Sequence, residues 1–299
     1  MTTRGGLTRW VLLVVFCAGA ISTGLAGAPG THQASATSPS SVAVVQSATT
    51  EAWTDAEMER FLKAAKVIKT KAASKGVTNS TQATMSDGTI THDAHIQIID
   101  EYKREFRSST GIEFDFRDSW SFNVAAYKLD RLIGLNMVPV SIPGRYRSSR
   151  AAISWWVNDV MMDEGARLKR NLEAPEDKKR LWNQQIYMLR IFDQLIYNVD
   201  RNLGNQLISS DWRIWAIDHT RAFRKHTTLK SPAYVSRCDR EVFQRLKALD
   251  RDLLKRELGP YLDDGQIKGI LARRDAIVSK LESVGPSALF DKQVPATVH

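Results

Sequence analysis

The feature that most strongly restricts how this chain can fold is a run of eight residues, N-V-D-R-N-L-G-N, at positions 198–205. The run follows a long amphipathic helix and enters a hairpin whose second strand ends at Asp218. Asp200 and Asn205 lie five residues apart in the sequence. Gly204 lets the loop between them bend sharply, so both can lie on one turn. Because a hairpin reverses the chain, we expect Asp218 to return beside Asn205. Two carboxylates and one amide then converge at one end of a strand pair.

This set of side chains is typical of magnesium-dependent phosphoryl transfer. Mg²⁺ prefers hard oxygen ligands and keeps several waters, so one or two carboxylates plus phosphate oxygens suffice. In protein kinases an Asp positions the acceptor hydroxyl, an Asn five residues later holds metal, and a later Asp after a strand holds metal again. Asp200, Asn205 and Asp218 match these roles in order and spacing. A lone Asn-Val-Asp would be read as a simple turn.

Two strings, over residues 193–205 and 217–223, resemble the atypical kinase superfamily. That superfamily includes the phosphatidylinositol 3- and 4-kinases, the HipA-type bacterial kinases and the secretory-pathway casein kinase group. Its members share an N-x-D-R-x-x-G-N core followed by an I-D-x-x-x-A-F element. The resemblance covers roughly residues 76–281 and is closest to a bacterial branch.

The resemblance implies an α+β, two-lobed kinase-like fold. A small β-containing N-lobe would occupy residues 76–160 and a larger helical C-lobe residues 161–285. Asp200 would be the catalytic residue. Asn205 and Asp218 would bind the cofactors, holding Mg²⁺ or Mn²⁺ together with ATP or a related nucleotide.

The small lobe departs from the family pattern. Members use a Lys on the third strand to hold phosphates and a helix acid to orient that Lys. Here the matching, cofactor-binding positions carry Gln97 and Asn123. The replacement of Lys by Gln97 is consistent with the replacement of the acid by Asn123, because together they leave no lone buried charge. An alignment shifted by a residue or two would instead bring Lys103 or Arg104 to the phosphates.

A neutral amide can still donate to a phosphate, but without charge-assisted strength. The leading hypothesis is therefore a phosphotransferase acting on a protein or another hydroxyl-bearing acceptor. The alternative is an exported pseudokinase, a module that binds a nucleotide or phospho-ligand without transfer. Action on lipid headgroups is a third, weaker hypothesis.

The remaining elements follow from periodicity and turn signals. A capping box at Thr54 starts a helix assigned to residues 53–75, and Asp87-Gly88 marks a hairpin turn. The other expected elements are strands near 81–86, 89–99 and 138–142, a loop over 100–119, helices near 120–133, 240–258 and 263–284, and a loose tail over 286–299.

The N-terminus predicts export. Arg4 and Arg9 precede an apolar run and small residues, which is typical of a signal peptide over residues 1–28. A Ser/Thr/Pro-rich linker follows over 29–52. The apolar run is shorter than the roughly 20 residues of a spanning helix. We therefore expect a periplasmic or secreted protein, with an uncleaved N-terminal anchor as the open alternative and membrane contact only in that case.

Charge and cysteine content narrow the function classes. The formal net charge is +9, which suits phosphate-bearing ligands, but 33 acidic residues are interspersed with 42 basic ones, so no nucleic-acid partner is expected. Beyond the signal segment only Cys238 remains, which excludes a disulfide framework or a cysteine-based metal site. His92 and His95 lie three apart on a strand and face opposite sides, so they do not form a zinc pair.

Overall fold

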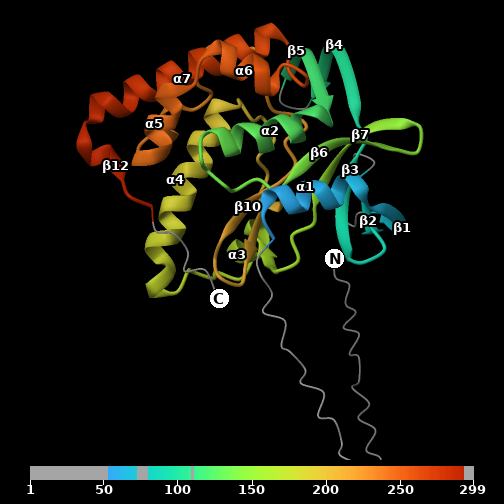
Figure 1. The fold of residues 1–299 in the computed structure, drawn as a ribbon. Helices are drawn as coiled ribbons and strands as arrows, with labels where there is room; N and C mark the ends of the chain where they lie inside the picture. The colour runs from blue at the N-terminus through green and yellow to red at the C-terminus, as the bar shows by residue number, and fades with distance from the viewer. Residues whose placement is uncertain (1–52, 73–79, 109–110, 293–299) are drawn as a thin grey trace, which may run out of the picture. The chain divides into compact units, whose positions relative to one another are not determined.

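A computed structural model describes residues 53–72, 80–108 and 111–292, all of which belong to the unit formed by residues 49–299 (Figure 1). The expected signal segment and linker lie outside the described residues. Within the described part of the chain, none of the helices combines the length and apolarity needed to cross a membrane.

The first half of the described chain is built around a five-stranded antiparallel sheet with the strand order β1-β2-β3-β7-β6. Its strands are β1 (Lys66–Ala72), β2 (Ser80–Ser86), β3 (Thr91–Gln97), β7 (Ser149–Trp155) and β6 (Ser141–Tyr146). The helices α1 (Asp55–Ala64) and α2 (Ser121–Leu132) pack against β6 and β7. The β2–β3 hairpin and α2 confirm the sequence expectations.

The helix expected over residues 53–75 is shorter than predicted. The capping box at Thr54 does start α1, but the helix ends at Ala64 and Lys66 begins β1. The β-branched residues Val67, Ile68 and Thr70 favour extended backbone, which explains the change. β1 then pairs with β2, so the sheet begins before residue 76.

The segment expected as a loop over residues 100–119 is a hairpin instead. β4 (Asp100–Ser108) and β5 (Gly111–Ser119) pair as a separate antiparallel ribbon. In β5, Ile112, Phe114 and Phe116 alternate with charged residues, which is a strand pattern, whereas β4 is charged at most positions and does not alternate. The rings of Phe106 and Phe116 stack across the ribbon at 4.2 Å between centroids.

The second half of the described chain is mainly helical. The long helix α4 (Lys179–Leu195) confirms the expected helix after Pro175 and buries an apolar face that includes Met188, Phe192 and Leu195. The other elements are β8 (Val160–Asp163), α3 (Glu164–Lys169), β9 (Gln206–Ser209), β10 (Ile214–Ala216), β11 (Cys238–Asp239), α5 (Arg240–Ala248), α6 (Arg251–Leu258), α7 (Asp264–Val284) and β12 (Leu289–Phe290).

Two expectations in this half need correction. The helix expected over 240–258 breaks at Leu249, because Asp250 caps α6 by accepting from the Leu253 N–H at 2.7 Å. The tail expected to be loose pairs Leu289–Phe290 in parallel with Cys238–Asp239. Residues 293–299 lie outside the described residues. The α+β architecture, with an antiparallel sheet region followed by a helical region, is confirmed.

Candidate functional site

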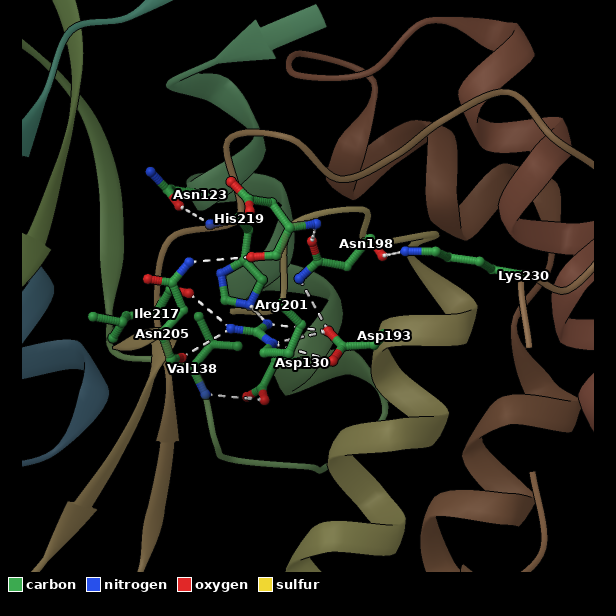
Figure 2. A network of polar contacts seen from close by, with 11 residues as sticks. Asn123, Asp130, Val138, Asp193, Asn198, Arg201, Asn205, Ile217, His219 and Lys230 are labelled. Carbon is green, nitrogen blue, oxygen red and sulfur yellow. Dashed lines mark hydrogen bonds and ion pairs between the residues drawn. The ribbon is translucent and has the colours of Figure 1, made fainter. Parts of the chain in front are cut away.

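Arg201 fastens the loop that follows α4 (Figure 2). Its Nε donates to both carboxylate oxygens of Asp193 on α4, at 3.1 and 3.2 Å. Its Nη1 donates to the backbone carbonyls of Asn205, at 2.9 Å, and Ile217, at 2.8 Å. Asn198 adds a bond from Nδ2 to the same Asp193 carboxylate. One guanidinium therefore joins the helix end, the loop and the end of β10.

Asp200 is held through its backbone while its carboxylate reaches solvent. Its N–H donates to Asn198 Oδ1 at 2.9 Å, and its carbonyl accepts from Asn205 Nδ2 at 3.2 Å. The Asp200 side chain is 40 % exposed. Fixed backbone with an accessible carboxylate is the arrangement needed by a residue that receives a proton from an incoming hydroxyl.

The hairpin brings Asp218 back beside Asn205, as the sequence predicts. Gln206 pairs with Ala216, and the Ile217 N–H donates to the Asn205 carbonyl at 3.1 Å. Asp218 adopts a left-handed backbone, with φ of 53°, and its Oδ1 accepts from Thr220 Oγ1 at 3.0 Å. A left-handed conformation costs roughly 1–2 kcal/mol for most residues, and less for Asp. The chain thus bends at Asp218, and the Thr220 hydroxyl orients its carboxylate.

His219 supports this region from the interior. The ring is buried, and burial, followed by the positive charge of Arg201, holds the His219 pKa well below its ordinary value. The imidazole is therefore neutral at pH 7, and its Nε2 accepts from Arg201 Nη2 at 2.9 Å. With its Nε2 engaged in this way, His219 acts as a support of the loop and not as a base.

Asn123 reaches across to the same segment. It lies in the first turn of α2, is 6 % exposed, and its Oδ1 accepts from the His219 N–H at 2.8 Å. Gln97 is the last residue of β3, which is shorter than the strand expected over 89–99, and is 1 % exposed. Asn123 therefore holds the residue that follows Asp218, a contact that the sequence did not predict. Lys103 and Arg104 lie on β4, where the Lys103 ammonium pairs with Glu101 at 2.9 Å.

The structure adds charged residues that the sequence analysis missed. Arg221 Nη1 lies 3.8 Å from Asp200 Oδ2, and its Nη2 lies 3.7 Å from Glu113 Oε2 on β5. Arg224 Nε pairs with the other Glu113 oxygen. Arg221 stands three residues after Asp218, so its position was a usable signal. Glu113 could not be found, because its strand was expected to be a loop.

A groove of 570 Å³ borders Asp200 on the helical side. It runs between α4 and the loop, and it carries Arg190, Lys230 and Tyr234 on its walls. The Arg190 guanidinium lies 5.2 Å from the centroid of the Tyr234 ring. Asp200 is among the residues that line the groove.

The donor set fits a divalent metal that also binds phosphate. Among the residues that the structure describes, no group of three or more His, Cys, Asp or Glu side chains could hold a metal ion. Asn205 and Asp218 offer an amide oxygen and a carboxylate, both hard donors, on backbone segments that the bond from the Ile217 N–H to the Asn205 carbonyl joins. Two such donors match a Mg²⁺ or Mn²⁺ ion whose other ligands are water and phosphate oxygens.

Comparison with known proteins identifies the fold. No protein-family model and no curated protein matches the chain. Among solved structures, the Golgi casein kinase is 13 % identical, with a TM-score of 0.52, over 80 % of this chain and 79 % of that one. The Golgi casein kinase with Mn/ADP bound is 13 % identical, with a TM-score of 0.55, over 82 % and 81 %. The Helicobacter pylori proinflammatory kinase CtkA is 11 % identical, with a TM-score of 0.40, over 72 % and 92 %.

The chain therefore has a two-lobed, atypical kinase-like fold. The expected resemblance to this superfamily is confirmed at the level of the fold. At 11–13 % identity the likeness carries no statement about reaction or acceptor.

Proposed function

We propose that this protein is a phosphotransferase that moves a phosphoryl group from a metal-bound nucleotide, ATP or a relative, to a hydroxyl on a protein or small molecule. The observation that carries the proposal is the single Arg201-centred network that fixes the backbone around Asp200, Asn205 and Asp218. A structure of similar fold has Mn/ADP bound, which supports a nucleotide and a divalent metal.

Asn205 and Asp218 would hold Mg²⁺ or Mn²⁺, which when bound would neutralise charge on the phosphates. The acceptor hydroxyl would enter from the groove beside Asp200. Its oxygen forms a bond to the terminal phosphorus while the bond from that phosphorus to the bridging oxygen breaks. The hydroxyl proton passes to the Asp200 carboxylate, and the nucleoside diphosphate leaves with the electron pair. Positioning and charge neutralisation supply most of the catalysis in such transfers.

A pseudokinase is the second candidate, and Gln97 is the observation that favours it. Gln97 is a buried neutral amide, and the sequence resemblance aligns it with the phosphate-binding Lys of family members. Such a domain would bind a nucleotide or phospho-ligand without transferring a group. Export and the possible N-terminal anchor remain predictions from residues 1–28, and the absence of a nucleic-acid partner remains a prediction from charge.

Thermal unfolding with and without Mn²⁺ or Mg²⁺ plus ATP tests nucleotide binding. A ligand at 100 times its Kd adds about 2.7 kcal/mol of stability, which raises Tm by several degrees. We expect the shift to vanish in Asp218→Ala and to persist in Asp177→Asn, an exposed carboxylate in the 3-10 turn before α4. A wild-type protein that shows no shift with any nucleotide would contradict the proposal.

Asp200→Asn then separates enzyme from pseudokinase. The substitution keeps the backbone contacts of residue 200 but removes the proton acceptor. We expect it to retain the nucleotide-dependent shift and to lose transfer of labelled phosphate to a panel of acceptor proteins and polyols. Binding without transfer by the wild-type protein would favour the pseudokinase.

A further inference from the structure

Gln97 and Asn123 are neutral, so a different side chain would have to supply the positive charge that faces the phosphates. Arg201 is committed, because Asp193, two backbone carbonyls and His219 occupy its donors. Lys103 is paired with Glu101. Arg221 differs from both, because it lies at the site and its contacts with carboxylates are long.

Arg221 stands at the end of the site where transfer would occur. Its Nη1 lies 3.8 Å from Asp200 Oδ2, about 1 Å beyond a charge-assisted hydrogen bond. Its Nε is buried and has no hydrogen-bond partner among the residues that the structure describes. The guanidinium therefore has donors in reserve, while 28 % of the side chain stays exposed.

The β4–β5 ribbon holds this guanidinium in place. The Phe116 ring centroid lies 5.2 Å from its central carbon, a cation–π contact. Glu113 faces it at 3.7 Å and is itself fixed by Arg224. Arg224 is buried and donates from Nη1 to the Arg117 carbonyl at 2.6 Å. A cation supported in this way is oriented before any ligand arrives.

We propose that Arg221 binds the terminal phosphate of the nucleotide and that Glu113 orients it, so that the ion pair missing from Gln97 and Asn123 is rebuilt on the other side of Asp218. A planar guanidinium with several N–H donors matches phosphate geometry better than the amide of Gln97 does. The inference rests on the proposed function. It differs from a fully solvated surface ion pair, which contributes little to stability.

Equilibrium binding of ATP and ADP with Mn²⁺ tests the inference. Because Arg221 lies beside Asp200, it would contact the phosphate that ADP lacks. We expect Arg221→Gln to weaken ATP binding about tenfold or more and ADP binding by less than threefold. Arg221→Lys should keep part of the preference for ATP, and Glu113→Gln should lower that preference without abolishing binding. The matched control is Arg107→Gln, an outward-facing residue of the same ribbon that is 74 % exposed.

Three results would decide the matter. Equal ATP and ADP affinities in wild type and Arg221→Gln, with Asp218-dependent binding intact, would overturn this inference and leave the proposed function standing. No nucleotide binding by the wild type would overturn both. If thermal melts show that Arg221→Gln does not fold, the ATP preference of Glu113→Gln and Arg221→Lys decides, and unchanged preference in both overturns the inference.

Discussion

The two sides of the candidate site are built on different principles. On the helical side, Asp200, Asn205 and Asp218 stand on backbone that one charged network fixes, with Arg201 donating to Asp193 and to two carbonyls. On the sheet side, Gln97 and Asn123 are buried and neutral. The side with Asp200 and Asp218 is therefore charged, whereas the two positions on the sheet side are neutral.

The difference shows which contacts the architecture requires. Asn123 connects the two sides, because its Oδ1 accepts from the backbone N–H of His219. A carboxylate there without a Lys on β3 would be a lone buried charge, which is expensive. The neutral pair thus keeps the connection between the sides and avoids that cost. Arg221 and Glu113 lie 3.7 Å apart, and each side chain is 28 % exposed, so this charged pair stands where solvent still reaches.

We expect the largest loss of stability from removing the Arg201 guanidinium on the charged side of the site. Arg201→Ala leaves the Asp193 carboxylate, which is 13 % exposed, without its cation and frees two carbonyls. Removing one partner of a buried pair costs 3–5 kcal/mol, and we expect about 3 kcal/mol of lost unfolding free energy in urea denaturation. Arg201→Lys should recover part of the loss. A cost below 1 kcal/mol would mean that the network does not hold the loop.

The next prediction places a charge on the neutral side. Gln97→Lys puts an ammonium at a position that is only 1 % exposed. We expect a cost of about 3 kcal/mol relative to Gln97→Met, which has similar length and no charge. With ATP and Mn²⁺ present, phosphate would supply the countercharge and the difference should shrink. A difference that ATP leaves unchanged would place residue 97 away from the phosphates.

The third prediction concerns the hydrogen bond between Asn123 and His219 that connects the two sides. Asn123→Ala removes the acceptor of the His219 N–H and leaves a buried donor unsatisfied, at a cost of about 1–3 kcal/mol. Asn123→Asp keeps an acceptor oxygen and is the matched control for geometry. If Asn123→Ala is as stable as wild type in denaturant titrations, then a water replaces the contact and the two sides are not joined through it.

Local contacts explain what the sequence could predict. The loop from Asn198 to Asn205 and the return to Asp218 are fixed by turns and strand pairs a few residues apart, so their spacing encodes the geometry. The Asn123–His219 bond spans 96 residues, and nothing in either local sequence specifies it.

The β4–β5 ribbon was missed for a different reason. β5 alternates apolar and charged residues over 112–117, but β4 is charged at most positions and carries no such period. Glu113 and its ion pair with Arg221 were lost with it. Period 2 therefore predicts β5 alone, and neither its pairing with β4 nor its contact with the segment after Asp218.

The smallest expected effect is a pH dependence on the sheet side, away from the site. His92 stacks on Trp155 at 3.6 Å, and burial, only partly offset by a hydrogen bond from its Nδ1 to the Asp93 carbonyl, lowers the His92 pKa. A folded pKa below the unfolded value of about 6.5 means that the unfolded chain binds the proton first. The contribution of His92 is therefore present above pH 6.5 and declines as pH falls toward the folded pKa. Because the ring is half-buried, we expect a modest effect. The measurement is the unfolding free energy of wild type and of His92→Gln, each at pH 7.5 and at pH 5.5. Parallel pH profiles of the two proteins would show that the surroundings of Trp155 accept a charged ring.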